Sequence, residues 1–341
     1  MSDLVARAQL IMLAETLGVP PERVRHLERL GAENLRSLRE RISNLLFDEQ
    51  SATFARMSRL APLVPNGLVA RVSQAIVPPL VAGRAAGALG VDHPGRAKGV
   101  LSDLSPQYMA DCAPFLDQRT VAVLAPNIPP ALLIPAANEL MRRKAYVTAS
   151  WFLDYATPEA LLDLEAGIPD KAGLLHTTSL VQSDERLEQI VRLLPTERLA
   201  VIVRTAVESP ELLMAGLSLL ARLSPELAAD LGDILFEQLD DDGLTEVLRT
   251  VVGQDAIPEL LTVAAAVRED ALRRIAADPF LTEPATLEDF VDAAVEHDRW
   301  EGLLRVAEHL SGEAGRRINR AAKSAAKSAG NSAANTKAKA S

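Results

Sequence analysis

The sequence predicts an all-α protein made of stacked short helices, because helix-start signals recur along it and helix-forming residues carry its apolar content. Of the 341 residues, 48% are hydrophobic but only 4% are aromatic. Leu and Ala, which supply much of the apolar content, are good helix formers. An irregular all-α globule is the alternative architecture.

The phrase Ser-Pro-Glu-Leu occurs twice, at Ser209 and at Ser224. A Ser before a helix caps a free backbone N–H, a Pro in the first helical position loses no hydrogen bond, and a Glu in the first turn faces the positive end of the helix dipole. Each phrase therefore predicts a helix start, with one helix of about three turns between them. Variants of the signal begin at Val19, Leu104, Thr157, Leu194 and Ile257.

The apolar faces of these helices indicate stacking. Leu227, Leu231, Ile234, Leu235 and Leu239 form one stripe, whereas residues 211–223 are apolar nearly all round. The segment from Arg204 to Leu213 also resembles that from Arg249 to Leu261. A degenerate repeat of this kind is typical of an α-solenoid.

Three segments are expected. Residues 1–50 form an N-terminal helical module or cap, which turns at Gly31, and residues 51–313 form the repeat-like helical domain. Residues 314–341 form a basic tail that holds seven cations, no acid and one apolar residue larger than Ala. Such a segment buries too little surface to offset its chain entropy, so we expect disorder there, from about residue 320.

Patterns for most catalytic and metal sites are missing. Arg96-Ala97 stands where a phosphate loop needs Lys-Ser/Thr, the five histidines form no zinc motif, and Asp240 to Gly243 fits a capped turn better than a calcium loop. No nucleophile elbow occurs, and the single Cys112 is expected to be a small buried hydrophobe. We therefore expect a protein that is not an enzyme and needs no cofactor.

The location and the partner surface follow from composition. A single cysteine, the absence of a signal-peptide pattern and the prolines in the most apolar stretch predict a cytoplasmic protein without a transmembrane segment. Between residues 124 and 155, basic and aromatic residues follow a Pro-rich turn. Arg and aromatic residues often contribute most of the binding free energy of a protein interface. The candidate partner surface consists of Arg142, Arg143, Lys144, Tyr146, Trp151 and Tyr155. The other interpretation of this stretch is a helix pair in the core.

The segment from Leu223 to Val251 resembles the helical repeats in the cytoplasmic N-terminal domain of MgtE-type magnesium channels, and flagellar motor switch proteins have similar Pro-Glu-started helices. The resemblance spans about residues 182–277 and implies a superhelical stack of short helices. CBS domains and a channel, which MgtE-type proteins would bring, are not found in the sequence, so no ion-binding residue is carried over.

Three functions are open at this point. The first is an interaction scaffold or adaptor that binds a protein partner. The second is a binder of nucleic acid or anionic lipid through the tail. The third is a carrier of an apolar or lipid ligand between Ala/Leu/Val-rich helices. The cations that would contact a polyanion in the second case are Arg316, Arg317, Arg320, Lys323, Lys327, Lys337 and Lys339.

Overall fold

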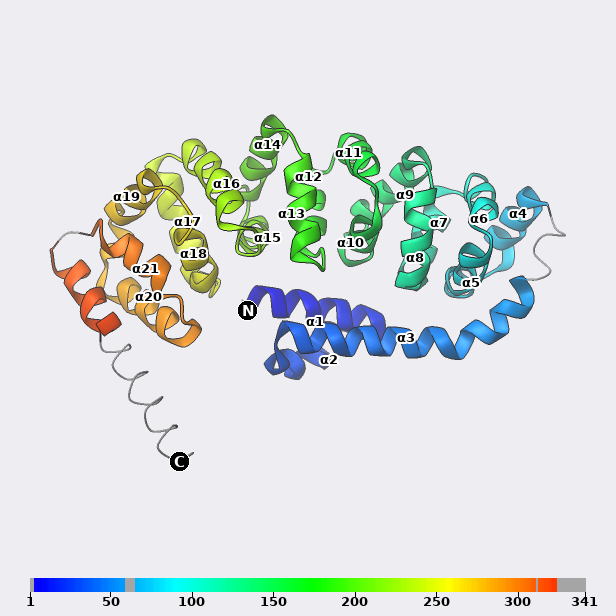
Figure 1. Cartoon of the computed structure of the whole chain (residues 1–341), viewed down its shortest axis with the longest axis horizontal. Helices are drawn as coiled ribbons and strands as arrows, with labels where there is room; N and C mark the ends of the chain where they lie inside the picture. The colour runs from blue at the N-terminus through cyan, green and yellow to red at the C-terminus, as the bar shows by residue number, and fades with distance from the viewer. Residues whose placement is uncertain (1–2, 59–64, 311, 324–341) are drawn as a thin grey trace, which may run out of the picture. The chain divides into compact units, whose positions relative to one another are not determined.

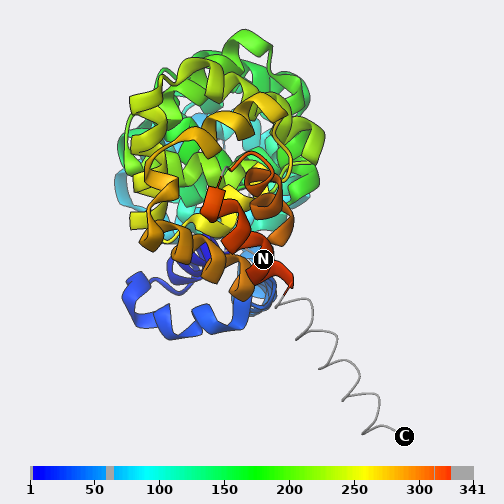
Figure 2. The ribbon, with the colours of Figure 1, turned by 90° about the vertical axis from the view of Figure 1, so that its left-hand side faces the viewer.

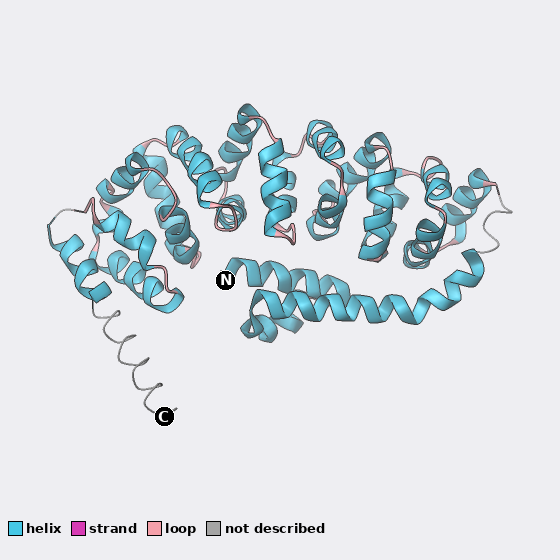
Figure 3. Ribbon diagram, in the orientation of Figure 1, coloured by secondary structure: helices cyan, strands magenta, loops and turns pink. Residues whose placement is uncertain are grey.

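The computed structural model describes residues 3–58, 65–310 and 312–323. Within these ranges the chain is helical, with short connections and no strand (Figure 3). The predicted all-α fold is therefore confirmed. Contacts divide the chain into two units, which we call unit 1 (residues 3–195) and unit 2 (from residue 196).

Unit 1 contains thirteen α-helices among its described residues (Figure 1). Their bounds are α1 Asp3–Leu17, α2 Pro21–Val24, α3 Gly31–Ser58, α4 Asn66–Ile76, α5 Pro79–Asp92, α6 Pro94–Leu101, α7 Pro106–Cys112, α8 Gln118–Leu124, α9 Pro130–Arg142, α10 Tyr146–Tyr155, α11 Pro158–Gly167, α12 Lys171–Ser179 and α13 Asp184–Leu193. Three short 3₁₀ segments, Arg25–Leu30, Ala113–Phe115 and Ala125–Asn127, lie between them.

The helices of unit 1 from α4 onward form two layers, because each helix contacts the next but one along the chain. The contacts α4·α6, α6·α8, α8·α10 and α10·α12 build one layer, and α5·α7, α7·α9, α9·α11 and α11·α13 build the other. This alternation is what a stack of helix pairs produces. We call α4–α12 the unit 1 stack.

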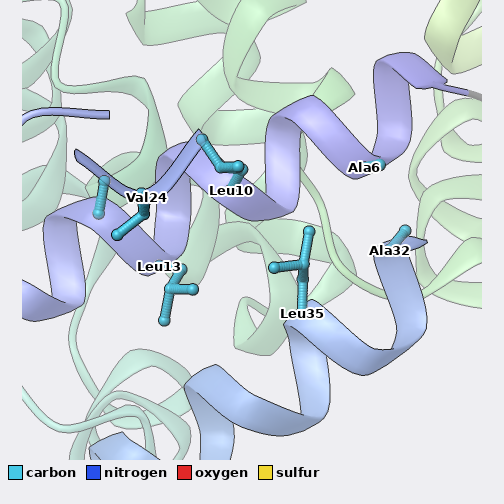
Figure 4. Packing of buried hydrophobic residues seen from close by; sticks show 7 residues of the cluster. Ala6, Leu10, Leu13, Val24, Ala32 and Leu35 are labelled. Carbon is cyan, nitrogen blue, oxygen red and sulfur yellow. The ribbon is translucent and has the colours of Figure 1, made fainter. Parts of the chain in front are cut away.

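Helices α1 and α3 pack against each other through a small apolar core of their own. It consists of seven buried residues, Ala6, Leu10, Leu13, Ala14, Val24, Ala32 and Leu35 (Figure 4). Gly31 makes the predicted corner, with a positive φ of 74° that favours glycine. Helix α3 then continues to Ser58, beyond the predicted boundary at residue 50.

Unit 2 contains the eight helices α14–α21 and, after them, the helical residues 312–323. The bounds of the eight are α14 Thr196–Ala206, α15 Pro210–Leu220, α16 Pro225–Gln238, α17 Asp241–Gly253, α18 Ile257–Ala264, α19 Glu269–Ala277, α20 Pro284–His297 and α21 Trp300–Ala307, with a 3₁₀ turn at Phe280–Thr282. The contacts α14·α16, α16·α18 and α18·α20 again join alternate helices.

The predicted helix starts are found in unit 2. Helices α15 and α16 begin at Pro210 and Pro225, and the Ser209 side chain accepts a hydrogen bond from the backbone N–H of Leu212. The Ser224 side chain makes no such capping bond. Asp240 caps α17 by accepting from the backbone N–H of Gly243 at 2.8 Å, so the acidic run is the predicted capped turn.

The helical part of unit 2 extends past residue 313, where the basic tail was expected to begin. Residues 312–323 are helical, and they lie beside α20 and α21 in both views (Figures 1 and 2). Ile318 is fully buried, and Arg317 pairs with Glu288 of α20 at 3.3 Å. The one large apolar residue of this segment therefore finds a place in the core, which composition alone did not indicate.

Candidate functional site

Unit 1 holds a cavity of about 440 Å³ between the two layers of the unit 1 stack. Its lining extends from Val69 and Ser73 of α4, and Val77 directly after it, to Leu174 and Thr177 of α12. All seven intervening helices contribute residues to it as well.

The cavity exists because small side chains face one another across the stack. Eight alanines lie in its wall, where leucines would fill the space: Ala82, Ala85, Ala86, Ala97, Ala113, Ala136, Ala137 and Ala149. Close-packed interiors leave few voids larger than a water molecule, so a hollow of this size is unusual for a simple core.

The wall offers almost no free polar group. Tyr108 donates its hydroxyl proton to the carbonyl oxygen of Val77 at 2.9 Å, and Thr177 donates to the carbonyl oxygen of Gly173 at 2.7 Å. Among the described residues of the lining there is no Asp, Glu, Lys, Arg or His side chain. The cavity can therefore hold a hydrocarbon group but has no ion to pair with a charged one.

Cys112 and Tyr108 are the titratable groups of the wall. Burial raises the pKa of Cys112 to about 11 and, with a smaller effect of neighbouring Cys112, the pKa of Tyr108 to about 12. Both groups are therefore neutral near pH 7. Cys112 is buried, as predicted, and its neutral thiol is a poor nucleophile.

The exposure of the wall changes along the stack. All seven lining residues from α4 to α5 are half-buried or exposed, and Val81 is 41% exposed. Of the seven lining residues from α10 to α12, only Phe152 is not buried. The lining is therefore most exposed to solvent at α4 and α5, and we take this end as the open end of the cavity.

The predicted partner surface is only partly a surface. Arg142 and Lys144 are exposed, whereas Trp151 is 6% exposed and packs with Met12 of α1 and Val147. Tyr146 is half-buried and stacks on His176, with ring centroids 4.9 Å apart. Tyr155 is 36% exposed. The stretch thus combines a core helix pair with a few exposed side chains.

The two arginines of that stretch form an ion-pair network with acids of unit 1. Glu139 accepts from Arg142 and Arg143, at 2.6 and 2.7 Å, and Arg143 also reaches Asp111. Hydrogen bonds from the two arginines lower the pKa of Glu139 to about 2. These contacts join the end of α9 to α7, so the arginines already have intramolecular partners.

A buried polar contact fixes α3 on the unit 1 stack. Arg39 is 1% exposed and donates to the side-chain oxygen of Gln182 at 2.8 Å, while the backbone N–H of Gln182 donates to Asp154 at 3.2 Å. Burial is the largest cause that raises the pKa of Asp154 to about 6, against the lowering effects of Gln182 and Arg39. The charge state of Asp154 therefore changes in mildly acidic solution.

Four of the predicted tail cations lie in the helical segment of residues 312–323, namely Arg316, Arg317, Arg320 and Lys323. Lys327, Lys337 and Lys339 lie outside the described residues. Contact of any of these cations with a polyanion stays a prediction.

Within the described ranges, no cluster of His, Cys, Asp and Glu could hold a metal ion. None of the described helices is both long and apolar enough to cross a bilayer. Comparisons with protein-family models, with curated proteins and with solved structures give no match. The resemblance to the MgtE-type helical domain therefore stays a prediction about architecture.

The sequence allows an apolar carrier as one function but does not indicate which residues would form its site. The cavity residues come from nine helices, and none is unusual by itself. The local pattern in the sequence that points to the cavity is the run of small residues in α5, with Ala82, Ala85 and Ala86. Such a run predicts either a cavity wall of small side chains or a close helix crossing, and the sequence does not distinguish the two.

Proposed function

We propose that the unit 1 stack binds an apolar ligand with a long hydrocarbon part in its cavity, and that the protein acts as a carrier of such a ligand. The observation that supports this is the cavity of about 440 Å³ with its uncharged wall. Small-molecule sites are typically about 300–1,000 Å³ and mostly apolar.

The energetics of the cavity also favour an occupant. The lining is mostly apolar and opens to solvent at one end, so without a ligand part of its apolar surface stays in contact with water. A hydrocarbon chain in the cavity would remove that surface from water, which is favourable.

The predicted scaffold role stays a prediction, as do the polyanion-binding tail and the absence of enzymatic activity. For the scaffold, Trp151 was to be a contact residue, and its burial removes it from any surface that a partner could reach. The carrier is therefore the function with the more specific support.

The lone cysteine gives a direct test, because Cys112 lies in the cavity wall. At about pH 9, where more of the Cys112 thiol is ionised than at pH 7, we expect oleate to slow its alkylation by monobromobimane. We also expect oleate to displace N-phenyl-1-naphthylamine, a dye that fluoresces in apolar sites. A Cys112→Ser variant gives the background of alkylation.

A matched pair of substitutions on α9 links these signals to the cavity. Ala137 lies in the wall, whereas Ala131 is exposed and outside it. Ala137→Phe should abolish dye binding, and Ala131→Phe should leave it unchanged. Equal dye binding by both variants, or alkylation that is indifferent to oleate, would contradict the proposal.

A further inference from the structure

Helix α4 carries apolar residues on two adjacent faces. Val69 and Ser73, with Val77 directly after the helix, follow one another at intervals of four residues and line the cavity. Leu68, Val72 and Ile76 have the same spacing, one residue earlier, and are 52%, 42% and 76% exposed. One residue is about 100° of helical rotation, so the exposed stripe lies next to the cavity-facing one.

The exposed apolar surface continues onto the neighbouring segments. Leu80 and Val81 at the start of α5 are 39% and 41% exposed, and Val81 also lines the cavity. Phe115 is 38% exposed and lies close to Gly83 of α5, where an added Cβ would meet the Phe115 side chain. We call Leu68, Val72, Ile76, Leu80, Val81 and Phe115 the apolar rim.

A surface helix normally buries its single apolar stripe and exposes polar residues. Helix α4 is held in place with its second stripe uncovered. Gln74 accepts from the backbone N–H of Ser105 at 2.8 Å, and the carbonyl of Val77 accepts from Tyr108. These contacts tie α4 to the start of α7, so α4 is held in an orientation that leaves the apolar rim exposed.

The segment that carries five of the six residues of the apolar rim is basic, whereas the chain as a whole is acidic. Residues 65–103 hold four cations, Arg71, Arg84, Arg96 and Lys98, and two acids, whereas the whole chain has a net charge of −10. Arg71 and Lys98 are exposed. An exposed apolar face with cations beside it is typical of helices that lie in the interface of an anionic membrane.

We propose that the apolar rim docks on the surface of an anionic lipid bilayer and forms the entrance through which a lipid chain reaches the cavity. This inference rests on the proposed carrier function. It fits two further observations. The open end of the cavity is at α4 and α5, and the wall holds no ion for a charged headgroup, which would stay at the rim beside Arg71 and Arg84.

The test uses flotation of the full chain with vesicles of phosphatidylcholine alone and with 30% phosphatidylglycerol. We expect binding to the anionic vesicles and little binding to the neutral ones. Ile76→Asp should weaken the binding about tenfold, because it removes one large apolar contact and adds a like charge. Val295→Asp is the matched control, since Val295 is 57% exposed on α20 of unit 2.

The outcomes separate docking from ligand binding. If Ile76→Asp and Val295→Asp float as the wild type does, the apolar rim is not the docking site. If the wild type binds neither kind of vesicle, the proposed membrane docking is wrong, and another protein becomes the candidate partner of the apolar rim. Ala137→Phe should still float while it no longer binds the dye. If the wild type does not bind the dye, the proposed carrier function is wrong.

Discussion

The unit 1 stack and unit 2 both place alternate helices in contact, yet their interiors are filled differently. The twelve largest fully buried side chains among the described residues include seven in unit 2, such as Leu261, Leu272 and Leu303. None lies in α4–α12, and the other five belong to α1, α3 and α13. The same helix arrangement thus surrounds large, fully buried side chains in unit 2 and a cavity lined by many alanines in the unit 1 stack, so the two interiors differ in side-chain size.

The largest expected difference is in the cost of truncating a core leucine. Leu303→Ala in unit 2 leaves a new void around a fully buried side chain and should cost about 3–5 kcal/mol. Leu133→Ala in the cavity wall only enlarges an existing hollow and should cost about 1–2 kcal/mol. Hydrogen exchange of peptides from each unit measures both values. Equal costs would mean that the hollow is not a lasting feature.

The next difference concerns pH and rests on Asp154 in unit 1. Its pKa is raised from 3.8 to about 6 in the folded chain, so the folded state holds the proton more tightly than the unfolded state. The resulting stabilisation is complete below pH 3.8 and is lost as the pH rises to about 6. The change amounts to at most about 3 kcal/mol.

The Asp154→Asn variant isolates this effect, because the amide does not titrate. The wild type should lose stability relative to the variant between pH 4 and 6, in peptides of unit 1 and not in those of unit 2. A difference between wild type and variant that stays constant over this range would show that burial does not raise the pKa of Asp154.

Filling the interiors should act in opposite directions in the two units. Ala294 in α20 is fully buried, and Ala294→Leu should overpack unit 2 at a cost of about 1–3 kcal/mol. Ala137→Leu places its added carbons in the cavity and should stabilise unit 1 by about 0.5–2 kcal/mol. Thermal unfolding of the two variants without ligand gives the comparison. Destabilisation by both would indicate that the unit 1 stack has no spare volume.

The sequence predicts the local structure better than it predicts the site. Helix starts depend on neighbouring residues, so Ser209 and Asp240 could be assigned directly. The burial of Trp151 depends on Met12, which only the tertiary structure brings to it. The cavity depends on eight alanines spread over five segments of the stack, and the place of Ile318 in the core depends on its contacts with helices elsewhere in unit 2. Such contacts leave no pattern in a single sequence.

The smallest expected effect is one that the two units should share. Ser105 of unit 1 caps α7 through the N–H of Tyr108 at 3.3 Å, and Ser209 of unit 2 caps α15 through the N–H of Leu212, also at 3.3 Å. Each Ser→Ala substitution should cost about 1 kcal/mol, because a cap acts within its own helix turn and does not depend on how the interior is filled. Chemical denaturation measures both. If Ser105→Ala costs much more than Ser209→Ala, the hollow stack depends on its helix starts more than the filled one does, and side-chain size would no longer be the sole difference between the two regions.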